Sequence, residues 1–323
     1  MLKNKTLNIL DWLVHTPHQF ELAKLGHNFY YLKEGERYPW NYTMRPKSPN
    51  CYFIMHANPD NFDLIIAHNS GHVKMIETWK IQGTLTKDIP LIYMFHFSPH
   101  NEEVKKNMVE ILQGYHLIFN SYANQMEWNM PNEHQRTIIH GFDMDEWPAW
   151  KGGTNGVLNV AGAMGRRGTV TGYDLWCKVA NLVGTEKFFV IGSKWPYMKD
   201  WQKDIVRETK NWNDLKGMLR KYDVYFSPTL NSPFPRARSE AFATGMPMVA
   251  TSYHNSNIYI QHGINGFSAN EPDECAFYIK LLLNNKELRH KFSKNARECA
   301  SEVLSGKRYR REWHNFISEI IGE

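Results

Sequence analysis

The sequence predicts an α/β protein with two parallel, doubly wound sheets. Short apolar, strand-like segments alternate with helical segments along the 323 residues, which is the pattern of successive βαβ units. A loop-rich passage at 147–156, which holds one proline and three glycines, interrupts this alternation as a linker does. The length fits two domains of about 150 residues each. We therefore expect one domain over 1–148, a second over 149–305 and a closing helix within 306–323.

The expected elements follow in chain order. In the first domain, strands are predicted at 6–12, 28–32, 52–55, 63–67, 91–95, 117–120 and 137–139, with helices such as 18–25 and 101–113. In the second domain, strands are predicted at 157–161, 187–191, 224–226 and 248–251, with a helix at 214–220. The closing helix is predicted because its apolar residues have helical spacing: Trp313, Phe316, Ile320 and Ile321.

Composition narrows the class of protein. The net charge is +5, and the excess of cations gathers at Arg166-Arg167, at Arg236 and Arg238, and at 307–311. Such clusters can bind a diphosphate, an anionic lipid surface or nucleic acid, or can be solvated surface. The four cysteines have no paired short spacing, so neither a zinc knuckle nor a disulfide framework is expected. No apolar run is long enough to span a membrane, and we expect a cytoplasmic protein.

The segment 227–251 is the most informative stretch of the chain. A β-branched and aromatic strand ends at Ser227-Pro228, a polar loop and a helix follow, and Pro247 precedes the next strand. In open α/β sheets, ligands bind beyond the carboxyl ends of the strands, where this loop must lie. Glu240 stands near the start of the helix, where a carboxylate can accept hydrogen bonds from a ribose or can simply favour the helix dipole.

These residues carry a resemblance. Ser227-Pro228 together with 240–250 resembles the donor-site signature of retaining glycosyltransferases of family 4, the group 1 glycosyl transferases of the GT-B fold. Segments 262–267, 285–289 and 295–297 are similar to later parts of that family, and 25–27, 63–68, 92–96 and 140–143 match it more loosely. The resemblance implies two Rossmann-like domains facing across a cleft, with the C-terminal helix returning to the N-terminal domain.

The resemblance also implies an activity. Such an enzyme moves a sugar, here expected to be a hexose, from a nucleoside-diphosphate sugar to an acceptor hydroxyl, with retention of the anomeric configuration and without a metal or another cofactor. The acceptor hydroxyl attacks on the face from which the diphosphate leaves, and the protein supplies positioning and electrostatics. The acceptor itself stays open, and peripheral contact with a membrane remains compatible with the sequence.

For the donor, the resemblance assigns residues one by one. Glu240 and its neighbour Ala241 correspond to the ribose-binding position, and Arg166 corresponds to the arginine that holds the diphosphate. The family's lysine position is Thr171 here, so Arg167 and Lys194 are candidates for the missing charge. Further expected donor contacts are Arg236, which with Arg238 faces phosphate or lines an anionic acceptor path, and Trp212, near the nucleobase. Eight residues before Glu240, the family's first glutamate is replaced by Ser232.

For catalysis, the resemblance points to His96, Ser232 and Arg166, because His96 follows the strand 91–95 at the place of a histidine that reaches the donor sugar. The loop with His15, His18 and Gln19 is expected to border the acceptor. Two groups of residues could bind a metal by their chemistry. One is His15, His18 and Glu21, and the other is the D-x-D-like Asp143-Met144-Asp145. The first group has no evident further ligand and the second falls on an interdomain corner, so no metal is expected.

Two alternatives remain at this point. The basic excess also suits a glycosyltransferase that modifies a hydroxylated base in DNA. The replacements at Ser232 and Thr171 also suit a relative that binds a nucleotide sugar or a glycan without transferring it.

Overall fold

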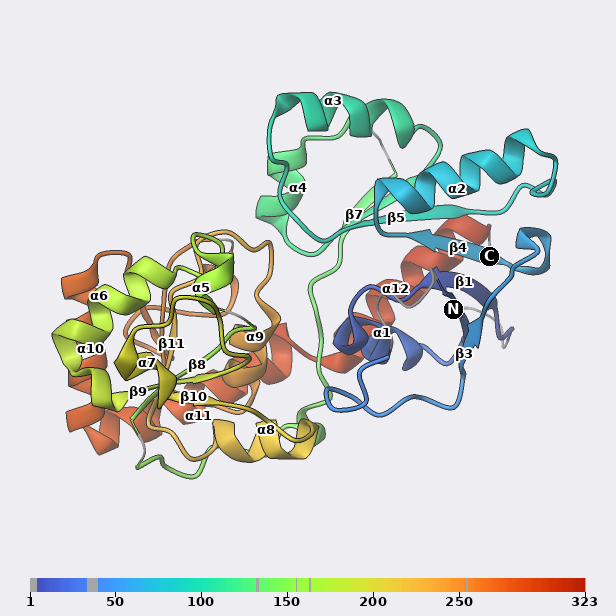
Figure 1. The fold of residues 1–323 in the computed structure, drawn as a ribbon. Helices are drawn as coiled ribbons and strands as arrows, with labels where there is room; N and C mark the ends of the chain where they lie inside the picture. The colour runs from blue at the N-terminus through green and yellow to red at the C-terminus, as the bar shows by residue number, and fades with distance from the viewer. Residues whose placement is uncertain are drawn as a thin grey trace. The chain divides into compact units, whose positions relative to one another are not determined.

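The structure is a computed structural model that describes residues 5–33, 40–131, 134–154, 156–162, 164–253 and 255–322. The chain forms two compact units (Figure 1). Unit 1 comprises Met1–Ile139 together with Tyr309–Glu323, and unit 2 comprises His140–Arg308. Among the described residues, no helix combines the length and the apolar character needed to cross a membrane.

Unit 1 is built on a seven-stranded parallel sheet in the order β3-β2-β1-β4-β5-β6-β7. Its strands are β1 (Asn8–Trp12), β2 (Asn28–Leu32), β3 (Cys51–Ile54), β4 (Leu64–Ala67), β5 (Leu91–Phe95), β6 (His116–Phe119) and β7 (Gln135–Thr137). Its helices are α1 (Thr16–Ala23), α2 (Ser70–Ile81), α3 (Glu102–Ile111), α4 (Tyr122–Trp128) and most of α12 (Gly306–Ile321), with the short turn η1 (Pro59–Asn61). Figure 1 shows α2, α3 and α4 on one side of this sheet and α1 and α12 on the other.

The central strands of unit 1 are buried on both faces. Every residue of β4 and β5 is buried, which is why these strands read as continuous apolar runs rather than as alternating patterns. One face of the sheet packs against Val73 and Ile76 of α2, Met108 of α3 and Trp128 of α4. The carboxyl ends of β4 and β5 therefore emerge from a core that is covered on both faces.

Unit 2 is built on a six-stranded parallel sheet in the order β10-β9-β8-β11-β12-β13. Its strands are β8 (Val157–Val160), β9 (Phe188–Ile191), β10 (Val206–Arg207), β11 (Val224–Ser227), β12 (Met248–Ala250) and β13 (Phe267–Ser268). Its helices are α5 (Met164–Arg167), α6 (Tyr173–Val183), α7 (Asp200–Lys203), α8 (Trp212–Leu219), α9 (Arg236–Ala243), α10 (Pro272–Asn284) and α11 (Lys286–Val303), and its short turns are η2 (Met144–Glu146), η3 (Thr185–Lys187) and η4 (Ser256–Ile258). Helices α6 and α10 share one core with the sheet, centred on Trp176, Cys275 and Phe226.

The predicted fold class is confirmed, because both units are parallel α/β sheets flanked by helices. The predicted strands are present, and their ends differ from the predictions by at most two residues. Strand β7 is shifted by two residues at both ends relative to the predicted 137–139. The sequence did not reveal the two-residue strands β10 and β13, because such short edge segments leave no periodic signal. The closing helix is α12, and from Tyr309 onward it belongs to unit 1.

Candidate functional site

Each sheet has one point at which the strand order reverses. In unit 1 this point lies between β1 and β4, and in unit 2 it lies between β8 and β11. At such a switch point the loops that follow the two strands leave in opposite directions, which opens a crevice at the carboxyl edge of the sheet. The candidate site residues of each unit lie at these edges, and each unit is described by itself.

In unit 2, the loops after β8 and β11 pack closely, and glycine is required where they meet. Gly172 has a φ of 71°, and a Cβ atom there would lie 1.8 Å from the carbonyl oxygen of Pro228. The backbone N–H groups of Leu230 and Asn231 both donate to the carbonyl oxygen of Val170. The two loops that flank the switch point therefore form one packed unit.

Thr171, which stands at the family's lysine position, holds this loop together. Its hydroxyl donates to the carbonyl oxygen of Met164 at 2.8 Å and lies 3.1 Å from that of Gly168. The side chain is buried, so it shapes the loop from within. A side chain that binds a diphosphate must point out of the loop, whereas the side chain of Thr171 points into it.

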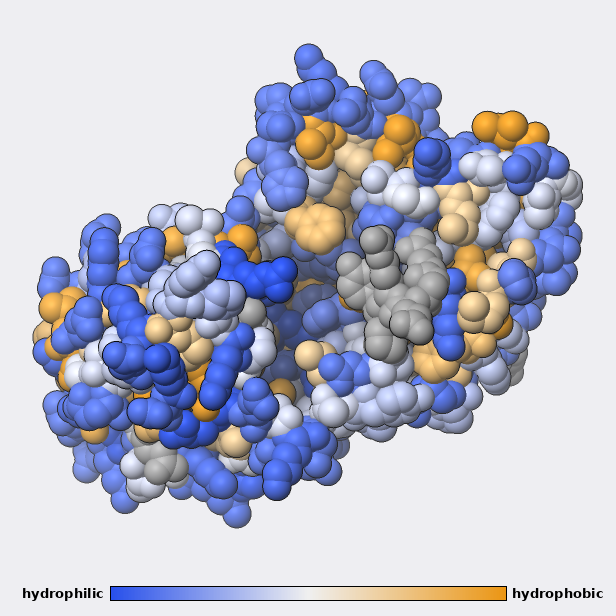
Figure 2. Space-filling model, in the orientation of Figure 1, coloured by the Kyte–Doolittle hydropathy of each residue, from blue (hydrophilic) through white to orange (hydrophobic). Residues whose placement is uncertain are grey.

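Three cations lie in the loops beyond β8 and β9. Arg166 and Arg167 are on α5 and Lys194 follows β9, and all three are exposed. The surface of unit 2 around α5 and α7 is largely hydrophilic (Figure 2). Guanidinium and ammonium groups in this position can bind the oxygens of a diphosphate, because strands β8 and β9 are neighbours and end at the same edge.

Glu240 lies in α9, just beyond the loop after β11. Its Oε1 accepts a hydrogen bond from Nε of Arg236 at 2.9 Å, and each of the two side chains is only 8% exposed. The guanidinium of Arg236 also lies over the ring of Phe142, 4.9 Å from its centroid. Arg236 therefore binds Glu240, the residue predicted to bind the ribose, and its guanidinium is not a solvated surface charge. Ala241, the neighbouring predicted contact, is fully buried.

Arg238 does not behave like Arg236. Its Nε donates to the hydroxyl of Tyr259 at 2.6 Å, and the side chain is buried. Two roles were expected for Arg238, namely facing phosphate or lining an anionic acceptor path. The structure supports neither, because the guanidinium is buried against Tyr259 and the carbonyl oxygen of Tyr253.

Two further predicted donor contacts lie at the same edge of unit 2. Ser232 is half-buried in the loop between β11 and α9. Trp212 is the first residue of α8, which leads from β10 back to the sheet, so it begins at the carboxyl edge. Its ring packs edge-on against Trp147, and Nζ of Lys216 lies 4.0 Å from its centroid.

In unit 1, the carboxyl edge at the switch point holds a carboxyl group and two imidazoles in a line. Nε2 of His68 lies 2.5 Å from Oδ1 of Asp11, and Nδ1 of His68 lies 2.8 Å from Nε2 of His96. Asp11 is near the end of β1, His68 directly follows β4, and His96 directly follows β5. The sequence predicted His96 but missed Asp11 and His68; the signals were an acid inside an apolar strand and a histidine at a strand end.

The line of three groups lies in an environment that disfavours charge. Burial raises the pKa of Asp11 well above its ordinary value, although the Trp12 N–H that donates to it works in the other direction. Burial lowers the pKa of His68 to about 3 and that of His96 well below its ordinary value, the latter with a further contribution from His68. The short contact between Asp11 and His68 is therefore a hydrogen bond that shares one proton rather than a pair of opposite charges.

The predicted acceptor-side residues differ in what they expose. His15 precedes α1 and is exposed. Gln19 is fully buried, accepts from the N–H of His15 and donates to the carbonyl oxygen of Trp12, so its amide holds the β1–α1 loop. His18 is buried, with its ring edge-on to His68 and His96. Only His15 of these three presents its side chain to solvent.

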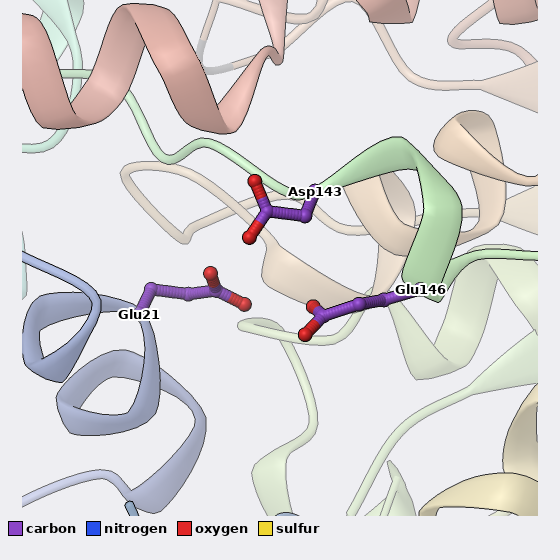
Figure 3. A group of neighbouring side chains, drawn as sticks. All are labelled: Glu21, Asp143 and Glu146. Atoms are coloured by element: carbon purple, nitrogen blue, oxygen red, sulfur yellow. The ribbon is translucent and has the colours of Figure 1, made fainter.

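The residues weighed as metal ligands come from both units. Glu21 lies on α1 of unit 1, whereas Asp143 and Asp145 belong to the corner around η2 of unit 2. Figure 3 draws the side chains of Glu21 and Asp143 together with that of Glu146, which was not among the ligands considered from the sequence. The η2 corner is held by Arg297, whose guanidinium donates to the carbonyl oxygens of Met144 and Trp147. Among the described residues of either unit taken alone, no three His, Cys, Asp or Glu side chains bring one ligand atom each to a common point.

Comparison with known proteins addresses the fold and the second half of the chain. Residues 202–299 match the family model described as Glycosyl transferases group 1. The UDP-Gal:alpha-D-GlcNAc-diphosphoundecaprenol alpha-1,3-galactosyltransferase of Escherichia coli is 24% identical over 135 residues, which cover 39% of this chain and 34% of that protein. The matched part thus spans about a third of the length of this curated relative.

Two solved structures are similar over almost the whole chain. Sucrose-phosphate synthase from Thermosynechococcus elongatus has a TM-score of 0.74 at 14% identity, with 98% of this chain and 100% of that chain covered. Alr3699/HepE from Anabaena, in complex with UDP, has a TM-score of 0.71 at 16% identity, again with 98% and 100% covered. The structural likeness shows that the chain has the GT-B fold, and the match to the group 1 model covers residues 202–299.

Proposed function

We propose that this chain is a glycosyltransferase that takes a sugar from a nucleoside-diphosphate sugar, a UDP-sugar first of all, and transfers it to an acceptor hydroxyl. The observation that carries the proposal is the edge of unit 2, where Arg166, Arg167 and Lys194 gather beyond β8 and β9 while Glu240 follows β11. Support for the uridine base comes from the UDP bound to Alr3699/HepE and from the UDP-galactose donor of the Escherichia coli relative.

In this proposal the residues of unit 2 divide the donor among them. The exposed cations bind the diphosphate, Glu240 accepts hydrogen bonds from the ribose, and Trp212 packs near the base. Ser232 is assigned to a hydroxyl of the transferred sugar, because its loop adjoins the Gly172 loop that follows β8. Arg236 fixes the orientation of the Glu240 carboxylate, and Thr171 fixes the loop.

The proposed reaction is a transfer of a hexose with retention, in which the leaving diphosphate accepts the proton of the attacking hydroxyl. Arg166 stabilises the charge that develops on the leaving group, a part that guanidinium groups can take without a metal. His96 keeps the catalytic role that the resemblance implies and contacts the transferred sugar. Ser232 brings no negative charge, so the electrostatic stabilisation comes from the diphosphate and its cations.

A thermal-shift panel tests the donor. A bound ligand at about 100 times its dissociation constant adds about 2.7 kcal/mol to the free energy of unfolding, so the correct nucleotide sugar raises the melting temperature measurably. We expect a response to a UDP-sugar and a smaller one to GDP- or ADP-sugars. The absence of any response across the three nucleotides contradicts the proposal.

Hydrolysis of the donor tests whether the chain is a catalyst and not only a nucleotide-sugar-binding protein. With the responding donor, we expect slow release of free sugar and nucleoside diphosphate without any acceptor, measured by phosphate-coupled detection, and its loss in Glu240→Gln. The matched control is Glu287→Gln, which neutralises an exposed acid in the first turn of α11 in the same unit. Hydrolysis that survives in Glu240→Gln, or is lost in the control, contradicts the assignment. Proton NMR of the product reports the anomeric configuration, and activity in excess EDTA reports metal independence.

A further inference from the structure

A line of three hydrogen-bonded side chains runs behind His96 in unit 1. The carboxyl group of Asp11 contacts the first imidazole, that of His68, at 2.5 Å, and the second nitrogen of this ring contacts His96 at 2.8 Å. The three side chains are carried by adjacent strands, because β1 pairs with β4 and β4 pairs with β5. Asp11 and His68 are buried, and His96, the last member, is half-buried.

Four titratable groups face the line, and burial shifts the pKa values of three of them away from neutral pH. The groups that face it from the neighbouring elements are His18 on α1, Tyr31 on β2, Cys51 on β3 and His72 on α2. Burial lowers the pKa of His72 to about 2 and raises the pKa values of Tyr31 and Cys51. Imidazolium ions in this region are therefore disfavoured.

The geometry allows two arrangements of protons along the line. With Asp11 ionised, its carboxylate accepts from Nε2–H of His68, Nδ1 of His68 accepts from Nε2–H of His96, and Nδ1 of His96 carries a lone pair. With Asp11 protonated, its O–H donates to Nε2 of His68, Nδ1–H of His68 donates to Nε2 of His96, and Nδ1 of His96 carries a proton. The two arrangements differ by one proton, and both imidazoles are neutral in each.

We propose that Asp11 and His68 form a two-step proton relay behind His96, so that a proton taken up at Nδ1 of His96 comes to rest on the Asp11 carboxylate. The relay moves no heavy atom. The incoming proton binds Nδ1 of His96, the proton on Nε2 of His96 passes to Nδ1 of His68, and the proton on Nε2 of His68 passes to Oδ1 of Asp11. One proton enters and one negative charge disappears.

The use of the relay in catalysis rests on the proposed function. A His96 that accepts a proton without becoming an imidazolium can exchange hydrogen bonds with sugar and acceptor hydroxyls without placing a positive charge near an oxocarbenium-like sugar. In this scheme His96 contacts the substrate, whereas Asp11 and His68 are positioning residues that set its tautomer. The wild-type relay can be tested without any substrate.

The test is a pH titration of the ¹⁵N-labelled full chain by histidine side-chain NMR, with assignment from His96→Gln and His68→Gln. On acidification we expect His96 and His68 to change from the Nε2–H to the Nδ1–H tautomer together, at one midpoint. Because ¹⁵N shifts separate both neutral tautomers from the imidazolium, the readout is direct. Conversion of His96 directly to the doubly protonated ring, or separate midpoints for the two rings, overturns the proposal.

Two variants sharpen the result. Asp11→Asn keeps an oxygen that accepts from His68 but cannot take up a proton, so His96 should become an imidazolium instead of changing tautomer. The matched control is His116→Gln, a partly buried histidine at the amino end of β6, on the opposite edge of the same sheet, which should leave both rings unchanged. A tautomer change that persists in Asp11→Asn overturns the relay. The wild-type titration decides the matter even if a variant does not fold.

Transfer kinetics provide the second readout. With the donor found in the thermal-shift panel, Asp11→Asn should lower kcat at least tenfold, leave the donor KM within twofold, and change the acid limb of the pH profile. A parallel loss in kcat and donor affinity, or an unchanged pH profile, shows a structural role only. If the wild-type chain transfers no sugar, the proposed function fails while the NMR titration still decides whether the relay exists.

Discussion

The contact between the loops after β8 and β11 gives the prediction that depends most directly on the fold. Gly172 combines a φ of 71° with a Cβ position 1.8 Å from the carbonyl oxygen of Pro228. Both features act against any side chain at this position. Because the obstructing atom is main chain, a rotamer change cannot relieve the clash. The substitution Gly172→Ala therefore tests whether the two loops really form one packed unit.

The expected loss of stability is the sum of two costs, reduced by one offset. A Cβ at left-handed φ costs about 1–2 kcal/mol, and forcing an extra methyl group into a packed contact costs about 1–3 kcal/mol. Loss of glycine's freedom in the unfolded chain offsets about 0.4–1 kcal/mol of this. Gly172→Ala should therefore lower the local free energy of opening by about 1–4 kcal/mol.

Two other glycines of the same loop are matched controls. Gly168 has a φ of 45° and open space around its Cβ position. Gly168→Ala therefore incurs the cost of a side chain at left-handed φ but no steric clash. Gly162 has open space and no left-handed φ, so Gly162→Ala should leave stability unchanged or raise it slightly. The three substitutions share the same added methyl group and differ only in geometry.

Hydrogen-exchange mass spectrometry of peptides that cover β8 and β11 reads the effect within unit 2. Each 1.4 kcal/mol corresponds to about tenfold faster exchange when opening precedes exchange, so Gly172→Ala should accelerate it from several-fold to several-hundred-fold. Gly168→Ala should have a smaller effect, and Gly162→Ala almost none. Equal exchange in Gly172→Ala and Gly168→Ala refutes the packed contact with Pro228, because only that contact separates them.

Exposed charge, buried charge and buried histidine give three further expectations. Arg166→Ala should weaken UDP-sugar binding about tenfold by calorimetry yet change the free energy of unfolding by less than about 0.5 kcal/mol, and an unchanged affinity contradicts its role. Arg236→Ala should destabilise unit 2 by about 3–5 kcal/mol in urea, because it removes the guanidinium that holds the buried Glu240 carboxylate; wild-type stability would show that the pair is not a buried one. Burial lowers the pKa of His27 from 6.5 to about 4, so between these values the unfolded chain binds a proton that the folded chain does not, and stability falls as the pH falls. The free energy of unfolding, measured by urea denaturation, should therefore depend less on pH in His27→Gln than in the wild type, by about 1.4 kcal/mol per pH unit between the two pKa values. An identical pH dependence contradicts the assignment.

The sequence predicted the fold well because parallel strands that are buried on both faces leave continuous apolar runs. Strands β4 and β5 are of this kind, and both appear where they were expected. The position of the donor edge was also predictable, because the order of strand, loop and helix around Glu240 fixes which edge the loop must occupy.

The contacts of individual side chains were not predictable in the same way. Arg236 and Arg238 are two residues apart and equally basic, yet one contacts Glu240 and the other is enclosed by Tyr259. The difference arises because two helix residues that are two positions apart point in directions about 200° apart. Charge alone therefore predicts that a helix end can bind an anion, but not which of two arginines takes part.

Asp11 and His68 were missed for a related reason. An acid within an apolar strand is easily taken for an interruption, and a histidine at a strand end for a solvated turn residue. Their meaning depends on β1 and β4 being neighbours, although 52 residues separate Trp12 from Leu64. Only the reversal of strand order at the switch point brings the two strand ends together.

The two units thus share a sheet topology, but three cations at the carboxyl edge are exposed in unit 2, whereas Asp11 and His68 at that edge of unit 1 are buried. At the carboxyl edge of unit 2, the cations Arg166, Arg167 and Lys194 are exposed, so their attraction for a diphosphate is strong at low salt and screened beyond about 10 Å at 0.1 M salt. At the carboxyl edge of unit 1, Asp11 and His68 are buried out of contact with solvent ions, so salt scarcely affects them. Added salt should therefore weaken donor binding by unit 2 while the midpoint of the His68 and His96 titration in unit 1 stays constant. A titration midpoint that moved together with donor affinity would show that solvent ions reach the relay, and the argument that burial keeps its imidazoles neutral would fail.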